Sequence, residues 1–146
     1  MKLKKISFKE VPYKKLNSKQ KEIRNFQTVA GLLAKYGFNC IKLADDWQGA
    51  DFLAYHIDRK TTLKIQLKSR LEISRRKYKN KEIFIAFPMK GGTWYLIDHD
   101  TLVVLVRKTT DWPKTKSWRG NNGGYSSQSL NPELIKAINE YGFKIG

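Results

Sequence analysis

The stretch TTLKIQLKSR, residues 61–70, alternates between apolar and polar side chains. Apolar side chains occupy its odd positions from Leu63 to Leu67, and polar ones, Gln66 and Lys68 among them, occupy the even positions. A period of two predicts a β-strand with one apolar face against a core. The polar face has two interpretations: an ordinary surface in solvent, or a surface that holds Gln66 and Lys68 toward a substrate.

The residues before this strand predict a helix followed by a strand. Residues 16–38 repeat apolar side chains at helical spacing, after a polar cap at Asn17 or Ser18 and before a stop at Gly37. Residues 38–43 then have the character of a strand. The helix therefore leads directly into the first strand of a sheet.

A hairpin is expected next. The turn-rich residues 44–49 precede a second strand at residues 50–57, and the short turn DRKT leads from it into the quoted strand. The odd-position phase of that third strand would continue through Leu71 and Ile73. Because only a short turn separates the second and third strands, we expect them to pair.

The second half of the chain starts with a strand of a different kind. The run IFIAFP within residues 82–88 is wholly apolar, which predicts a central strand buried on both faces. Residues 93–97 read as a further strand. Residues 98–108 suit either a helix, capped by Asp98 or Asp100, or another strand.

The remaining residues complete a single domain. Residues 109–129 are rich in loop-forming residues, and a helix should run from its cap at Asn131 to Tyr141 and stop at Gly142. No linker or repeat divides the chain. The order of elements predicts one α/β domain over residues 1–146, a mixed sheet of four to five strands flanked by helices.

Net charge is the strongest global signal in the sequence. The 146 residues contain 29 Lys and Arg against 13 Asp and Glu, a formal net charge of +16. Residues 1–81 hold 21 of the basic and 7 of the acidic side chains. A basic half of this kind is typical of proteins that bind nucleic acid. Simple solubility and attraction to an anionic membrane are the weaker explanations.

Cysteine and hydropathy narrow the setting. The one cysteine, Cys40, excludes a disulfide within the chain and reads as a small apolar core residue. His56 and His99 have no partners at metal-ligand spacing, so both are interpreted as structural or surface residues. No apolar stretch is long enough to cross a bilayer, and the amino terminus has no signal-peptide core. We therefore expect a soluble cytoplasmic protein without a membrane partner.

Four polar residues fall where the predicted elements can bring them together. Gln66 and Lys68 lie two apart and hence on one face of their strand. The residues 52–65 between Asp51 and Gln66 suit one hairpin with both side chains near the same end. Glu22 extends the apolar stripe of the first helix and can look toward the edge of the sheet.

These side-chain types share a chemical purpose. Hydrolysis of a phosphodiester uses a hard cation held by oxygen ligands, with room left for water and phosphate. Asp51 supplies a charged ligand, Gln66 a neutral amide oxygen, and Glu22 a ligand bound directly or through water. Lys68 can orient or deprotonate the attacking water and stabilise charge on the phosphate.

The motif GAD ending at Asp51, followed by IQLK at residues 65–68 and preceded by a helix bearing Glu22, resembles the PD-(D/E)XK nuclease superfamily. That group includes restriction endonucleases, Holliday-junction resolvases and some homing endonucleases. The resemblance covers roughly residues 16–97. It implies a restriction endonuclease-like core, Mg²⁺ or Mn²⁺ as cofactor and DNA as substrate. A cut through both strands further implies a homodimer or higher symmetric oligomer.

The carried-over site is Glu22, Asp51 and Gln66 at the metal and Lys68 at the water and phosphate. Ala50 stands where the family often has proline. Gln66 stands where it usually has Asp or Glu, although branches of the superfamily, including a homing-endonuclease type of similar length, have glutamine there. One ligand charge is lost, so metal affinity should depend on Asp51 and Glu22.

A set of basic residues is expected to grip the DNA. Residues 74–81, SRRKYKNK, follow the third strand directly and interleave Tyr78 with cations. Trp118 and Tyr125 in a glycine-rich loop read more readily as core anchors. The expected DNA-binding residues are Lys68, Arg70, Arg75, Arg76, Lys77, Lys79, Lys81 and Arg119.

Two other functions compete with the nuclease. One is a catalytically inactive nucleic-acid-binding protein on the same fold, in which Gln66 marks a decayed site. The other is an RNA-binding or ribosome-associated basic protein without nuclease ancestry. This last reading predicts that Glu22, Asp51, Gln66 and Lys68 are not neighbours in the folded chain.

Overall fold

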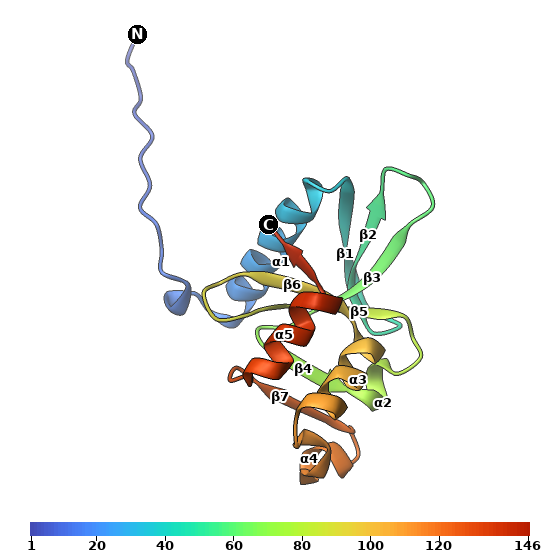
Figure 1. The fold of residues 1–146 in the computed structure, drawn as a ribbon. Helices are drawn as coiled ribbons and strands as arrows, with labels where there is room; N and C mark the ends of the chain where they lie inside the picture. Colours follow the sequence, from blue (N-terminus) through green and yellow to red (C-terminus); the bar gives the residue numbers. More distant parts are fainter.

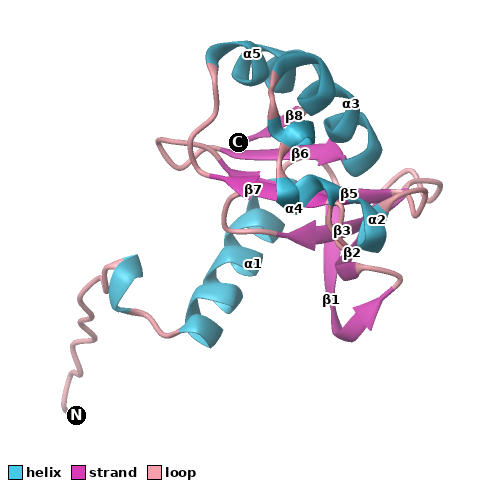
Figure 2. Ribbon diagram, turned by 90° about the horizontal axis from the view of Figure 1, so that it is seen from below, coloured by secondary structure: helices cyan, strands magenta, loops and turns pink.

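A six-stranded sheet with helices on both faces organises the computed structural model, which describes all residues from 1 to 146 (Figures 1 and 2). The main helices are α1 (Ser18–Ala34), α3 (His99–Thr109) and α5 (Pro132–Tyr141), with short α2 (Arg75–Tyr78) and α4 (Lys116–Arg119). The strands are β1 (Phe38–Trp47), β2 (Ala50–His56), β3 (Thr62–Leu67), β4 (Leu71–Ser74), β5 (Ile83–Pro88), β6 (Trp94–Asp98), β7 (Gly124–Ser127) and β8 (Phe143–Ile145).

The sheet is mixed. Its strand order is β1-β2-β3-β5-β6-β8, and β3 and β5 form the one parallel pair. A second sheet contains only β4 and β7. The expected α/β class with a helix-flanked mixed sheet is confirmed, but the expected four to five strands were too few. The structure has six strands in one sheet and two in another.

Helix α1 begins as the sequence indicates. The Asn17 side chain accepts a hydrogen bond from the Gln20 amide (2.8 Å), and the Gln20 side chain accepts one from the Asn17 amide (3.0 Å). This reciprocal cap satisfies two backbone donors that a helix start leaves free. One turn apart on the inner face, Val29 and Leu33 are fully buried against the sheet.

Strand β5 is central, as its apolar run predicts. It lies between β3 and β6 and contributes side chains to a separate hydrophobic core on each face of the sheet. Ile83, Ile85 and Phe87 pack in the larger core with α3 and α5, whereas Ala86 packs in the smaller core with α1. Figure 2 shows α1 on one side of the sheet and α3 with α5 on the other.

Several expected boundaries were wrong, beginning with β1. This strand continues to Trp47 through an irregularity after Lys42, so the turn into β2 is shorter than residues 44–49. The ambiguous segment 98–108 is a helix. Asp98 caps it by accepting from the Thr101 amide (2.9 Å).

The third strand does not continue as predicted. It ends at Leu67, and Leu71 and Ile73 belong to β4, which pairs with β7 in the small sheet. The segment 109–129, expected to be loop-rich, holds α4 as well as β7. β8, after Gly142, was not predicted because three residues are too few to show a period.

The small sheet is tied to the main one through a buried histidine. The Ser74 amide donates to Nε2 of His99 (3.2 Å), and the other ring nitrogen lies 3.1 Å from Asp100 Oδ1. Gly124 permits the close approach of β7, because a side chain there would collide with the Ile73 carbonyl oxygen. His99 is therefore a structural residue, as the sequence indicated.

Two further sequence predictions concern the packing of Cys40 and membrane-spanning segments. Cys40 is half-buried on β1 against the smaller core, and burial raises the pKa of its thiol to about 11. A thiol that stays protonated behaves as a small apolar side chain. None of the helices has both the length and the apolar character needed to cross a bilayer.

The link through His99 should make stability depend on pH. Burial lowers the pKa of His99, and this effect outweighs that of Asp100, which raises the pKa. The unfolded chain, with a histidine pKa near 6.5, therefore takes up a proton before the folded one does. The free energy of unfolding should fall as pH drops from about 7 toward 5, by up to about 1.4 kcal/mol per pH unit.

The measurement is urea unfolding across this pH range for the native chain and for His99→Gln. Glutamine keeps an acceptor but does not titrate, so the variant should lose less stability on acidification. His56→Gln removes the chain's other histidine and serves as the control, in which the loss should persist. An equal loss in His99→Gln would contradict the assignment.

Candidate active site

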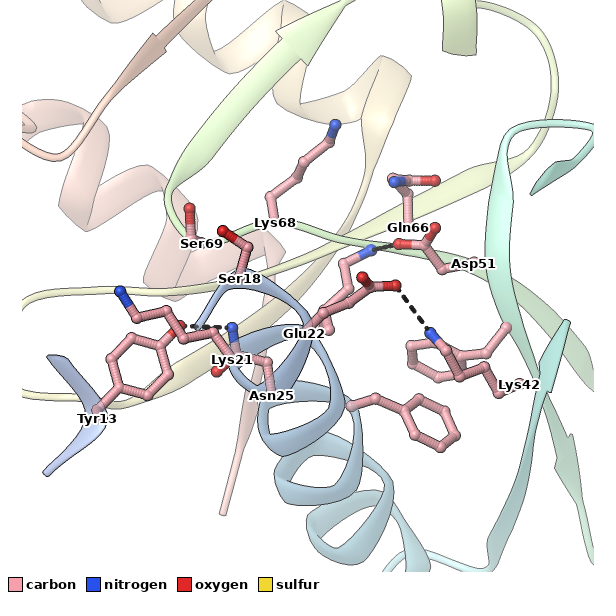
Figure 3. A pocket seen from close by; sticks show the side chains of 13 residues that line it. Tyr13, Ser18, Lys21, Glu22, Asn25, Lys42, Asp51, Gln66, Lys68 and Ser69 are labelled. Carbon is pink, nitrogen blue, oxygen red and sulfur yellow. Dashed lines mark hydrogen bonds and ion pairs between the residues drawn. The ribbon is translucent and has the colours of Figure 1, made fainter. Parts of the chain in front are cut away.

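A pocket of about 390 Å³ opens where the start of β2, the end of β3 and the first turns of α1 meet (Figure 3). Glu22, Asp51, Gln66 and Lys68 all line it. The hairpin and the helix thus bring together the four residues that the sequence singled out. Tyr13, from the short 3₁₀ turn Tyr13–Lys15, forms part of the rim.

Strand pairing places Asp51 opposite Gln66. The β2–β3 ladder pairs Phe52 with Ile65, so the next step of the antiparallel register sets Asp51 against Gln66. Asp51 Oδ2 accepts a hydrogen bond from the Leu67 amide (2.9 Å). The expectation that these two side chains lie at the same end of one hairpin is confirmed.

The surroundings of Asp51 destabilise the ionised form of its carboxylate. Burial raises the pKa of Asp51, and the nearby charge of Asp46 adds to this effect. The Leu67 amide, Lys42 and Lys68 act in the opposite direction but do not restore the usual value. A cation bound in the pocket would stabilise the ionised carboxylate and lower the pKa of Asp51.

Gln66 decides between the two interpretations of the polar face of β3. Its side chain is only 8% exposed, because β3 is an interior strand and both faces of the sheet are covered. Its Oε1 is the one buried side-chain nitrogen or oxygen in the structure without a hydrogen-bond partner. An unsatisfied buried acceptor costs about 1–3 kcal/mol. The solvent-facing interpretation is therefore wrong for Gln66.

Lys68 is held by an ion pair that the sequence did not reveal. Its Nζ lies 2.7 Å from Glu72 Oε2 and 5.5 Å from the centre of the Tyr78 ring. Burial by itself lowers the pKa of Lys68, but Glu72 and Tyr78 more than offset it and leave the pKa above its usual value. Lys68 is thus a stable cation and poorly suited to deprotonating water.

Glu22 reaches the pocket from α1 and is half-exposed. Its Oε1 lies 3.3 Å from Lys42 Nζ, and its Oε2 lies 3.7 Å from Lys19 Nζ. Sequence analysis missed Lys42, which sits on β1 opposite Phe52 and influences Asp51 as well. The β1–β2 register was the signal that could have found it.

The donor set of the pocket fits a hard divalent cation. The structure has no cluster of three or more His, Cys, Asp or Glu side chains suited to a metal. Asp51 and Gln66 instead offer a carboxylate and an orphaned amide oxygen, with Glu22 within the same pocket. Carboxylate, amide and water oxygens are the ligands that Mg²⁺ and Mn²⁺ take.

The expected DNA-binding cations divide into two groups. Arg70, Arg76, Lys77, Lys79, Lys81 and Arg119 are exposed. Arg75 instead donates to the carbonyl oxygens of Gly123 (2.8 Å) and Trp118, and it stacks on the Trp118 ring.

Arg75 therefore joins α2 to the segment before β7 rather than facing a ligand.

The aromatic residues nearby are structural as well. Tyr78 and Trp118 are 3% and 4% exposed. Tyr78 belongs to the larger core, which contradicts the expectation that it alternates with cations at the surface. Trp118 is a core anchor, as predicted.

Comparison with known proteins adds no further constraint. No protein-family model, curated protein or solved structure matches the chain. The pocket and the charge of the chain are therefore the features that bear on its function.

The ion pair of Lys68 generates a direct prediction. Replacing Glu72 by Gln removes the charge that offsets burial, so the pKa of Lys68 should fall below its value in the native chain. NMR titration of the lysine side chains measures it. Glu133→Gln makes the same charge change on α5 and should leave Lys68 unaltered. An unchanged Lys68 pKa in Glu72→Gln would show that the pair has no such influence.

Proposed function

We propose that the protein is a metal-dependent endonuclease that hydrolyses phosphodiester bonds in DNA, of the kind found in the PD-(D/E)XK superfamily. The observation that carries the proposal is the orphaned, buried Oε1 of Gln66 set opposite Asp51. Asp51 offers a carboxylate whose pKa is raised, and Gln66 offers an amide oxygen without a hydrogen-bond partner. A phosphodiesterase site requires oxygen ligands of this kind together with a cation such as Lys68.

The charge of the chain supports a polyanionic substrate. The net charge is +16, and exposed cations follow Lys68 along the segment that contains Arg76, Lys77 and Lys79. Phosphate contacts of this kind position a duplex without reading its sequence. The pocket is also accessible, because half of the Glu22 side chain faces solvent at its rim.

Each pocket residue has a distinct role in this proposal. Asp51 and Gln66, with Glu22, would hold Mg²⁺ or Mn²⁺, which supplies Lewis-acid activation of phosphate and water. Glu22 would exchange its contact with Lys42 for the metal or its water. Lys68 remains protonated and offsets negative charge on the phosphate, so it orients water rather than deprotonating it.

A second candidate is a nucleic-acid-binding protein on the same fold that does not cut. Two ion pairs favour it: Lys42 holds Glu22, and Glu72 holds Lys68. A pocket in which charges satisfy one another needs no metal. The third reading, a basic protein unrelated to nucleases, required the four residues to lie apart, and they share one pocket.

Cleavage of plasmid DNA separates the first two candidates. The native chain should nick a supercoiled plasmid with Mg²⁺ or Mn²⁺ and not in EDTA. Asp51→Asn should abolish nicking because the charged ligand is lost. Lys68→Ala should slow it by at least about 100-fold, the usual effect of losing one group that stabilises transition-state charge.

The matched control is Lys60→Ala, an exposed lysine in the turn at the opposite end of the β2–β3 hairpin. It makes the same substitution and should cut at the native rate. DNA binding without metal-dependent nicking, with Lys68→Ala behaving like the native chain, would leave only the second candidate.

The neutral ligand gives a separate prediction. Gln66→Glu adds a carboxylate beside Asp51, and one charge at about 4 Å contributes on the order of 1–4 kcal/mol in a partly buried site. The metal concentration for half-maximal thermal stabilisation should therefore fall by at least about fivefold, the factor that corresponds to about 1 kcal/mol. Without metal, repulsion between two buried carboxylates should lower the melting temperature below that of the native chain. A variant that binds metal no better would remove Gln66 from the ligand set.

A further inference from the structure

The amino-terminal segment, residues 1–11, projects from the body of the protein and is not explained by the pocket chemistry. It forms no helix or strand, and every residue in it is exposed (Figures 1 and 2). Leu3, Ile6 and Phe8 are between 79% and 94% exposed. These apolar side chains pack against nothing in the chain and are available to a binding partner.

The root of this arm is fixed at the mouth of the pocket. Tyr13 lines the pocket, and its hydroxyl accepts from Asn25 Nδ2 (2.9 Å). Lys21 and Arg24 stand over the Tyr13 ring at 5.4 and 5.5 Å, and Arg24 donates to the Val11 carbonyl (3.4 Å). A polymer with one unit in the pocket would therefore lie close to the point where the arm begins.

The charge of the arm favours a polyanionic partner. Residues 1–11 contain four lysines, Lys2, Lys4, Lys5 and Lys9, and one acid. Another pocket in the body of the protein has a volume of about 830 Å³ and is itself lined by Arg70 and Lys90. A basic arm on a chain of net charge +16 is repelled from a second copy at that pocket and attracted to a polyanion.

We propose that residues 2–9 are a DNA-binding arm that lies along the duplex beside the phosphate held in the pocket. The inference rests on the proposed function for the identity of the polymer. Fully extended, these residues and the root reach at most about 35 Å, comparable to one turn of B-DNA at about 34 Å. The lysines contact phosphates, and Ile6 and Phe8 pack on the sugar edges of the minor groove.

Salt dependence of binding tests the arm without requiring catalysis. The affinity for a labelled duplex is measured in EDTA at several salt concentrations. The substitutions Lys2→Gln, Lys4→Gln, Lys5→Gln and Lys9→Gln, made together, should reduce the slope of log affinity against log salt by about 3.6, since each of the four phosphate contacts contributes about 0.9. Deletion of residues 2–9 should do the same and leave the root at Val11 intact.

The control carries four lysine-to-glutamine changes at exposed positions away from the pocket, namely Lys35, Lys60, Lys136 and Lys144. It loses the same charge and should change the slope by less than one unit. An equal change in the control, or an unchanged slope in the arm variants, would overturn the proposal.

Self-association is the competing use of the arm. If deletion of residues 2–9 lowers the mass of the free protein in sedimentation and leaves the salt slope unaltered, the arm binds a second copy and the proposal is wrong. The nuclease proposal is tested separately by nicking. If the salt slope depends on the arm but the protein does not cleave DNA, the arm proposal stands and the nuclease proposal is rejected.

Discussion

The hydrogen bond from the Leu67 amide to Asp51 is the contact on which the site depends. The β2–β3 ladder reaches Phe52 and Ile65, and beyond that pair the Asp51 side chain bridges the two strands. On its other side β3 pairs with β5, and the Lys68 amide donates to the Ala86 carbonyl (2.9 Å). The end of β3 is thus held from both sides. Gln66 and Lys68 are positioned by sheet backbone, which is more rigid than a loop.

Holding the strand in this way has an electrostatic cost. It leaves Asp51 buried enough to raise its pKa, and it leaves Gln66 Oε1 without a partner. A fold selected only for stability removes such groups, whereas functional sites retain them. The neutral side chain of Gln66 limits the cost, because a second carboxylate at 8% exposure would repel Asp51. In the proposed metal site, glutamine at this position would therefore trade ligand charge for stability of the chain without metal.

The sequence predicted the parts of the site that depend on local pattern. Strand alternation and a short turn were enough to set Asp51 against Gln66, and helical spacing was enough to carry Glu22 to the rim. Glu72 was not predicted, because its place depends on β4 pairing with β7 across some fifty residues of chain. That pairing is fixed by a buried histidine and by close packing at Gly124, neither of which has a period. The same limit applies to Arg75 and Tyr78, whose burial the basic composition of their segment concealed.

The lysines of the pocket and those of the arm differ in their surroundings. Lys42 and Lys68 lie in the pocket, partly buried and paired with Glu22 and Glu72. The lysines of the arm are fully exposed and have no such partners among the ion pairs of the structure. Mobile ions screen exposed charges over about 8 Å at physiological salt and affect buried pairs much less. Higher ionic strength should therefore weaken the proposed binding of DNA at the surface, while the arrangement of charges around Asp51 and Gln66 stays the same.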